Sequence, residues 1–212
     1  MNAYDGVLLA SGGMDSTVLA YDLASKKKKI VILFLDYGQH CRETEYRTLK
    51  EVIPEIYKDN IRVIKIGDVY KESKSRMIVE ANLWTDDVVA DDLYLPYRNL
   101  LFLSIASAYA QSIGAPYVYS AFINSNHAKE IDCSMEFFTK LQSVLQMYGS
   151  VGIKMPYREM TKREVARLGV KLKAPVAATY SCQVNANNPC GACPNCVDKI
   201  DAINALLEDQ TP

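Results

Sequence analysis

The sequence lacks the features that would assign it to a membrane, a nucleic acid or a repeat architecture. No stretch approaches the roughly 18 consecutive apolar residues of a membrane span, and the first residues show no charged region followed by a long apolar one. Charge of either sign is not in excess, since 24 basic residues face 25 acidic ones for a net charge of −1, which argues against a polyanion-binding surface. Internal repeats and low-complexity segments are also missing. We therefore expect a cytoplasmic protein that binds no membrane and no long nucleic acid.

What the chain does contain is an alternation of apolar runs and helical patterns. With 212 residues and 49% hydrophobic content, it is long enough for one α/β domain and a small appendage. The patterns predict strands over 4–9, 30–35, 61–66, 116–122 and 151–155, and helices over 15–23, 42–53, 100–113, 132–148 and 161–169. Such alternation predicts βαβ units and a parallel sheet. We place the α/β domain at residues 1–175 and a small C-terminal segment at 176–212, in which the tail after Cys196 is predicted to form a last amphipathic helix to about Leu207.

The most informative stretch is Ser11-Gly12-Gly13-Met14-Asp15-Ser16, between the first predicted strand and the first predicted helix. Its glycines let the backbone approach an anion closely, the first helical amides point toward that anion, and the hydroxyls of Ser16 and Thr17 add donors. The spacing fits neither a Walker A loop nor a dinucleotide-binding loop. A Gly-Gly turn with capping residues is the plain structural alternative. The residues favour a site for pyrophosphate.

A second candidate segment, Asp36-Tyr37-Gly38-Gln39, follows the second predicted strand. Ligands of a parallel α/β sheet bind beyond the carboxyl ends of its strands. Because this segment and the Ser11–Ser16 loop both lie at such ends, we expect them to face one nucleotide.

Several connections carry predictions of their own. Periodicity fades over 67–97, which we interpret as a partly mobile lid over the substrate pocket. The sequence Thr161-Lys162-Arg163-Glu164 predicts a helix-capping box, and Gly169 suits the end of that helix. Asp132 is suited to cap the N-terminus of the helix predicted over 132–148.

Four of the six cysteines crowd into one short segment, at positions 182, 190, 193 and 196. Thiolates at this spacing suit a tetrahedral Zn²⁺ ion, and Gly191 would relieve the tight turn between Cys190 and Cys193. Four sulfurs leave no open position for water, so the zinc would be structural. An iron–sulfur cluster, a redox pair and chance clustering are the alternatives. Cys41 and Cys133 are left over and suit small buried positions.

The Ser11–Ser16 loop resembles the PP-loop, Ser-Gly-Gly-x-Asp-Ser, of the ATP pyrophosphatase superfamily. Members of that superfamily split ATP between its α- and β-phosphates. A longer ordered set of motifs resembles the 7-cyano-7-deazaguanine synthases of queuosine biosynthesis over nearly the full length. That set comprises the PP-loop, Leu35–Gln39, Pro96-x-Arg98-Asn99, Met160-Thr161-Lys162-x-Glu164 and Ser181-Cys182 with Cys190-Gly191-x-Cys193-x-x-Cys196.

The resemblance implies a fold, a reaction and cofactors. The fold would be α/β, with a Rossmann-like parallel sheet of the PP-loop ATP pyrophosphatase type and a small C-terminal zinc-binding segment. The reaction would convert 7-carboxy-7-deazaguanine and ammonia to the nitrile with ATP and Mg²⁺, through an adenylated carboxylate and an adenylated amide. Members of this family are zinc-containing and commonly homodimeric.

The resemblance also implies roles for individual residues. The catalytic candidates are Asp15, Arg98 and Lys162, the last two stabilising the transferring phosphoryl group. Plain alternatives are a surface ion pair for Arg98 and a solvated side chain for Lys162. The candidates for holding the β- and γ-phosphates with Mg²⁺ are Ser11, Gly12, Gly13, Asp15, Ser16 and Thr17. The candidates for the base of ATP are Asp36, Tyr37, Gly38 and Gln39, and the expected zinc ligands are Cys182, Cys190, Cys193 and Cys196.

The substrate side departs from the family pattern. Members usually carry Gly-Tyr-Pro-Asp-Cys-Arg after the fourth strand, whereas this chain has Lys129-Glu130-Ile131-Asp132-Cys133-Ser134. Asp132 would accept hydrogen bonds from the deazaguanine ring, and Lys129 is the candidate replacement for the missing arginine. The remaining candidates for binding the substrate are Tyr94, Asn99, Phe122 and Asn124.

Three other functions stay open at this point. A phage or antiviral relative would stop at the amide or join the activated deazaguanine to a protein amine. A tRNA thiolase would need Cys41 and Cys133 as a catalytic pair. A zinc-stabilised sensor would bind ATP without turnover.

Overall fold

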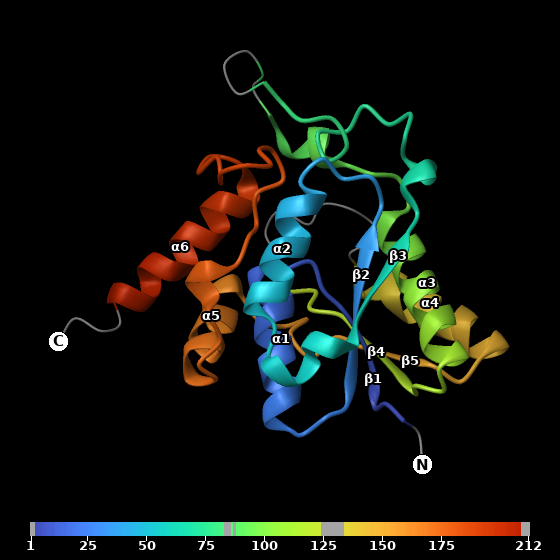
Figure 1. The fold of residues 1–212 in the computed structure, drawn as a ribbon. Helices are drawn as coiled ribbons and strands as arrows, with labels where there is room; N and C mark the ends of the chain where they lie inside the picture. The colour runs from blue at the N-terminus through green and yellow to red at the C-terminus, as the bar shows by residue number, and fades with distance from the viewer. Residues whose placement is uncertain (1–2, 83–85, 87, 124–133, 209–212) are drawn as a thin grey trace.

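A parallel five-stranded sheet organises the chain in the computed structural model, which describes residues 3–82, 86, 88–123 and 134–208 (Figure 1). The strand order is β3-β2-β1-β4-β5, and all paired neighbours run parallel. The strands are β1 (Gly6–Leu9), β2 (Ile30–Asp36), β3 (Ile61–Lys65), β4 (Tyr117–Tyr119) and β5 (Gly152–Lys154). The α/β fold and the parallel sheet are as predicted, although the fourth strand is shorter than the predicted 116–122.

Helices cover both faces of this sheet. The helices are α1 (Met14–Ser25), α2 (Arg42–Val52), α3 (Arg98–Ser112), α4 (Met135–Tyr148), α5 (Lys162–Lys171) and α6 (Pro194–Glu208). The shorter 3₁₀ turns are η1 (Glu55–Asn60), η2 (Gly67–Val69), η3 (Ala90–Leu93) and η5 (Val176–Ala178). One apolar cluster joins α1, α2 and α5 to the sheet, and a second joins α3 and α4 to its other face. Strand β2 is buried along its whole length, as its uninterrupted apolar run predicts.

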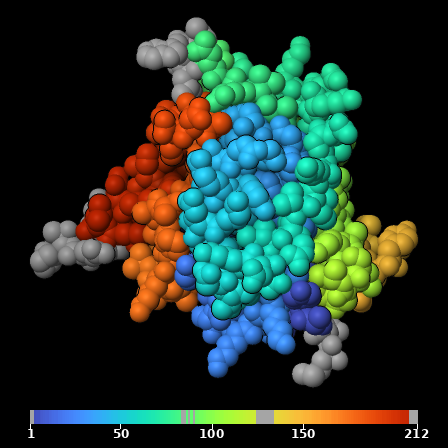
Figure 2. Space-filling model, in the orientation of Figure 1, coloured from blue at the N-terminus to red at the C-terminus, as the bar shows by residue number. Residues whose placement is uncertain are grey.

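The C-terminal elements lie along one side of the sheet domain. Helix α5 packs against α1, and α6 packs against α5. In the space-filling view the orange and red C-terminal residues lie directly against the blue and cyan ones (Figure 2). In the part of the chain that the structure describes, no helix combines the length and the hydropathy that crossing a bilayer requires.

The sheet has a place where the order of its strands reverses, and a ligand site is expected there. The strand order reverses between β1 and β4, since the chain adds β2 and β3 on one side and β4 and β5 on the other. Parallel α/β sheets bind ligands outside the carboxyl ends of their strands at this place. The Ser11–Ser16 loop follows β1 there, and Asp36–Gln39 follows β2.

The helix termini test three local predictions. Thr161 and Glu164 form the predicted capping box, in which Thr161 N donates to Glu164 Oε2 at 2.7 Å and Glu164 N to Thr161 Oγ1 at 3.3 Å. The backbone hydrogen bond from Thr161 lowers the pKa of Glu164. The capping role predicted for Asp132 belongs instead to Ser134, whose side chain accepts from Phe137 N at 3.1 Å, because α4 begins at Met135.

The prediction that Gly169 ends its helix is wrong. Helix α5 continues to Lys171, and Gly169 is buried within it. A methyl group at this position would lie 2.5 Å from Val176 Cγ1 and 2.8 Å from Val18 Cγ2. Glycine is therefore needed for close packing of α5 against α1 and η5, since any side chain would force the elements apart.

The 67–97 connection contains only short turns where it is described. Its backbone contacts include His40 N to Met77 O at 3.1 Å and Arg76 N to Asp92 O at 2.8 Å. Several of its apolar side chains are buried in a cluster with the cysteine segment, among them Tyr70, Met77 and Leu95. The connection contributes Met77 to the lining of the pocket described below, and both its role as a lid and its motion stay predictions.

Candidate active site

The Ser11–Ser16 loop is shaped by Gly12. Its backbone has a φ of +82°, and a Cβ built on it would lie 2.8 Å from both Glu45 O and Leu49 N of α2. Only glycine allows this left-handed conformation and this approach without strain. Gly13 directly precedes α1, whose first amides have no partner within the helix. The loop therefore presents backbone amides at a helix N-terminus, which is the arrangement that binds phosphate.

Asp15 and Lys162 meet beside this loop. Lys162, the first residue of α5, donates from Nζ to Asp15 Oδ2 at 2.6 Å, and the two side chains are 18% and 22% exposed. Lys162 is therefore no solvated lysine. Asp15 Oδ1 is buried with no hydrogen-bond partner among the described residues. An orphaned carboxylate oxygen beside a phosphate loop fits a Mg²⁺ ion bound with ATP.

A cavity of about 250 Å³ opens beyond β1, β2 and β4. Among the predicted site residues, its lining includes Ser11, Gly13, Asp15, Ser16, Tyr37, Gln39, Arg98, Asn99 and Phe122. Residues that the sequence did not single out also line it, notably Phe34, Glu45, Met77, Phe102 and Gln183. The loop after β1, the corner after β2 and the start of α3 thus share one pocket, as expected.

Six predicted residues lie next to the pocket or away from it. Gly12 shapes the loop without lining the pocket, and Thr17 is fully buried on α1. Lys162 contacts Asp15 and is not among the lining residues. Tyr94 is 48% exposed and is not among the lining residues. The other two, Asp36 and Gly38, are held in the corner of the chain after β2. Asn124, Lys129 and Asp132 lie outside the described residues.

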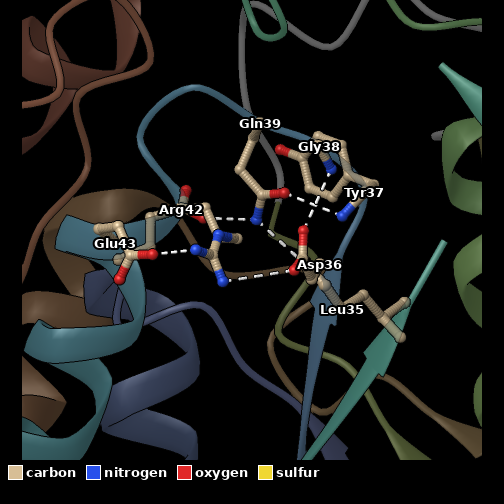
Figure 3. A network of polar contacts seen from close by, with 8 residues as sticks. Leu35, Asp36, Tyr37, Gly38, Gln39, Arg42 and Glu43 are labelled. Carbon is tan, nitrogen blue, oxygen red and sulfur yellow. Dashed lines mark hydrogen bonds and ion pairs between the residues drawn. The ribbon is translucent and has the colours of Figure 1, made fainter. Parts of the chain in front are cut away.

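The corner after β2 is held by its own side chains (Figure 3). Gln39 Oε1 accepts from Tyr37 N at 2.9 Å, and Gln39 Nε2 donates to Leu35 O at 3.2 Å. Asp36 accepts from Gly38 N at 3.3 Å and from Arg42 Nη1 at 3.4 Å. The carboxylate of Asp36 is therefore occupied in fixing the turn, while Tyr37 and Gln39 face the pocket.

Glu45 is the main residue that sequence reasoning missed. It is buried on α2 and accepts from Gln39 Nε2 at 2.9 Å. Burial raises the pKa of its carboxyl to about 7, against the opposing effects of hydrogen bonds from Gln39 and Cys41 and the charge of Arg98. Burial, together with the charge of Glu45, raises the pKa of Cys41. Glu45 shares the stripe of α2 that buries Leu49 and Val52, and a carboxylate on an apolar stripe is the signal that could have identified it.

Arg98 begins α3 and forms no direct ion pair among the described residues, although its charge acts on the carboxyl of Glu45. Its guanidinium donates from Nη1 to Met77 Sδ at 2.8 Å, and the surface ion pair considered as its alternative is not found in this part of the chain. The preceding Tyr97 has a φ of +56°, a left-handed conformation that is costly for an aromatic residue. A half-buried cation beside a pocket, with a thioether as its hydrogen-bond partner in the described part of the chain, suits an anionic ligand.

The four C-terminal cysteines form a compact group of thiols. Their sulfurs all lie within 4.8 Å of one another, and Cys190 Sγ is 3.9 Å from Cys196 Sγ. A tetrahedral ion with bonds of about 2.3 Å holds its sulfurs about 3.8 Å apart. An iron–sulfur cluster would separate them further, because its own irons and sulfides lie between the cysteines. The arrangement fits a single Zn²⁺ ion.

Local hydrogen bonds favour the thiolate form of one of these sulfurs, that of Cys182, whereas burial raises the pKa of Cys196 to about 11. A hydrogen bond from the Cys193 thiol, with backbone amides from Cys190 and Asn185, lowers the pKa of Cys182 to about 4. The Cys190 and Asn185 amides each lie 3.4 Å from Cys182 Sγ. Gly191 has a φ of +74°, which allows the tight turn between Cys190 and Cys193 as predicted.

Comparisons with known proteins agree on one family. The family model described as queuosine biosynthesis protein QueC matches residues 5–207. A 7-cyano-7-deazaguanine synthase from Picrophilus torridus is 34% identical over 204 residues, covering 90% of this chain and 83% of that protein. Another from Aquifex aeolicus is 28% identical over 221 residues, covering 98% and 100%.

A solved structure supports the fold independently. A 4-thiouridine synthetase in complex with RNA and bound ATP has a TM-score of 0.55 and 17% identity, covering 97% of this chain and 53% of that chain. At this identity the likeness shows the shared fold alone.

Proposed function

We propose a function from one premise, which is that the chain belongs to the family of the queuosine biosynthesis protein QueC. Its relatives along nearly the whole chain are 7-cyano-7-deazaguanine synthases. We infer that this chain likewise converts 7-carboxy-7-deazaguanine and ammonia to 7-cyano-7-deazaguanine, with release of AMP and pyrophosphate.

The observation that carries the proposal is the meeting of the phosphate loop, the Asp15–Lys162 pair and Arg98 at one pocket. A carboxylate does not react with ammonia until one of its oxygens becomes a leaving group. Attack of that oxygen on the α-phosphorus of ATP releases pyrophosphate and makes AMP the leaving group. Ammonia then forms the amide and releases AMP. Attack of the amide oxygen on a second ATP, followed by loss of AMP and a proton, gives the nitrile.

Each of these groups has a role in the reaction steps. The amides around Gly13 and Ser16 hold the β- and γ-phosphates. Asp15 is the residue in place to hold the Mg²⁺ ion that would accompany ATP, and this ion would supply positive charge to stabilise pyrophosphate as a leaving group. Lys162 fixes the orientation of Asp15, and Arg98 stabilises charge on the transferring phosphoryl group.

The aromatic part of the pocket suits a flat heterocycle. Phe102 and Phe122 line it, and Phe122 is supported from behind by Phe138 at a centroid distance of 4.9 Å. Asn99, buried at the start of α3, adds a polar side chain to this lining. These residues form the described part of the deazaguanine site, to which Lys129 and Asp132 are proposed to contribute.

Mass spectrometry of the product tests the proposal. The purified chain is incubated with 7-carboxy-7-deazaguanine, ATP, Mg²⁺ and ammonia, and the nitrile is expected together with AMP and pyrophosphate. An amide that accumulates without further conversion would identify the enzyme as one that stops after the first adenylation. Unchanged acid with no AMP would overturn the proposal. The homodimer is proposed from the family alone, and light scattering during size-exclusion chromatography tests it.

A further inference from the structure

The segment from Thr179 to Ala186 joins the cysteine group to the phosphate loop. Tyr180 N donates to Gly12 O at 3.0 Å. Tyr180 O lies 3.6 Å from the position that a Cβ on Gly13 would take. The backbone of the phosphate loop is therefore held by a residue only two positions before Cys182.

The same segment is bonded to the corner after β2 and to the start of α2. His40 Nε2 lies 3.1 Å from Gln183 O, and Thr44 Oγ1 donates to Ala186 O at 2.5 Å. Gln183 also lines the nucleotide pocket. The segment thus contributes Gln183 to the pocket and is bonded to two of the elements that surround it.

The path of this segment depends on the cysteine group. Asn185 N donates to Cys182 Sγ, and Tyr180 Oη donates to Asn185 O. Asn195, which lies on α6 between Cys193 and Cys196 in the sequence, donates to Gln183 Oε1 at 2.5 Å. Cys182 itself is 1% exposed and packs in one cluster with Cys41 and Tyr180. Moving Cys182 would therefore displace the groups that hold Gly12 and Gln183.

We propose that metal binding at the four cysteines and nucleotide binding at the phosphate loop are thermodynamically coupled through residues 179–186. The metal is a thiophilic divalent ion, with Zn²⁺ as the ion that fits the sulfur spacing. The inference rests on the proposed function in one respect, namely that ATP occupies the phosphate loop. It assigns Tyr180, Gln183 and Thr44 as positioning residues.

The coupling must act equally in both directions. If zinc raises the affinity for ATP by some factor, ATP raises the affinity for zinc by the same factor, and typical couplings are about 5- to 150-fold. A metal site that only stabilised the C-terminal segment would leave both affinities independent of each other.

Two equilibrium measurements on the full chain test this reciprocity. The affinity for Mg²⁺–ATP without deazaguanine is measured by calorimetry on the zinc-loaded and zinc-free chain. The affinity for zinc is measured by competition with a chromophoric chelator, with and without saturating ATP and with a protein-free blank for zinc held by ATP itself. We expect equal factors of at least about fivefold. Unchanged affinities in a zinc-loaded chain that binds ATP overturn the coupling alone, and absence of ATP binding overturns the proposed function with it.

A pair of matched variants keeps the test valid if the zinc-free chain unfolds. Thr44→Val removes the hydroxyl that donates to Ala186 O. Thr44 is not among the residues that line the pocket. Thr139→Val is the control, because the exposed hydroxyl of Thr139 donates, among the described residues, to Met135 O of its own helix at 2.8 Å. One lost hydrogen bond predicts about a threefold to tenfold fall in both affinities for Thr44→Val. Equal affinities in the two variants overturn the proposal.

Discussion

Gly12→Ala is the substitution whose cost the structure defines best. The new methyl group would meet the Glu45 carbonyl and the Leu49 amide at 2.8 Å, in a residue with a φ of +82°. Both contacts are with the backbone of α2, which cannot rotate away as a flexible side chain would. Two costs therefore add, one from the left-handed conformation and one from the close approach.

The expected magnitude follows from these two costs. The left-handed conformation costs about 1–2 kcal/mol for a residue with a Cβ, and overpacking costs about 1–3 kcal/mol. The free energy of unfolding should fall by about 2–5 kcal/mol. At about 2–4 °C per kcal/mol for a chain of this size, the midpoint of thermal unfolding should fall by about 4–20 °C. Circular dichroism during heating and urea titration measure both quantities.

Substitutions at two other glycines separate the cost of the left-handed conformation from the cost of the close approach. Gly114 has a φ of +69° with nothing within 4 Å of its Cβ position, so Gly114→Ala should show only the conformational cost of about 1–2 kcal/mol. Gly13 has an ordinary φ, and the nearest atom to its Cβ position is Ser11 Oγ at 3.4 Å. Gly13→Ala should therefore fold almost normally and bind ATP more weakly, because its methyl group enters the pocket. If Gly12→Ala were no less stable than Gly114→Ala, the close approach of the loop to α2 would be refuted as the reason for glycine.

Three further predictions follow from individual contacts. Lys162→Met should lower substrate-dependent ATP–pyrophosphate exchange about 10²- to 10³-fold, since Asp15 loses its 2.6 Å partner; isotope exchange measures it. The pKa of Glu45 is raised from 4.5 to about 7, so its contribution to stability is present below pH 4.5 and is lost as the pH rises through 7. In urea titrations across this range, the free energy of unfolding should change with pH by about 3 kcal/mol less in Glu45→Gln than in the unaltered chain. Gly169→Ala should destabilise the fold by about 1–3 kcal/mol, and adding Val176→Ala should recover part of this loss in urea titrations, because Val176 Cγ1 is the nearest atom at 2.5 Å.

The sheet and the phosphate loop were predictable because their signals are local. An uninterrupted apolar run is enough to predict that β2 is covered on both faces, and it is buried throughout. The order of strand, two glycines and helix likewise predicts the placement of Gly13 before α1. Pro54 correctly predicts that α2 has ended before it, at Val52.

The contacts that complete the site were not predictable, because they join residues far apart in the chain. The pairing of Lys162 with Asp15 spans 147 positions, and that of His40 with Gln183 spans 143. No local pattern reports such proximity. Asp36 shows the same limit at short range, since the sequence places it at the strand end and only the structure shows its carboxylate bonded to Gly38 and Arg42.

Gly169 illustrates a different failure. Glycine near the end of a helical pattern is typical of a C-terminal cap, but close packing of two elements needs glycine equally well. Only the positions of Val18 and Val176 distinguish the two reasons.

The most direct test of the account is the fate of oxygen during the reaction. If the carboxylate of the substrate is adenylated, 7-carboxy-7-deazaguanine labelled with ¹⁸O in its carboxylate must transfer label to AMP, and mass spectrometry should find one ¹⁸O in the AMP released at each step. Nitrile or amide formed with unlabelled AMP would show that ATP is cleaved without activating this carboxylate, and would contradict the account.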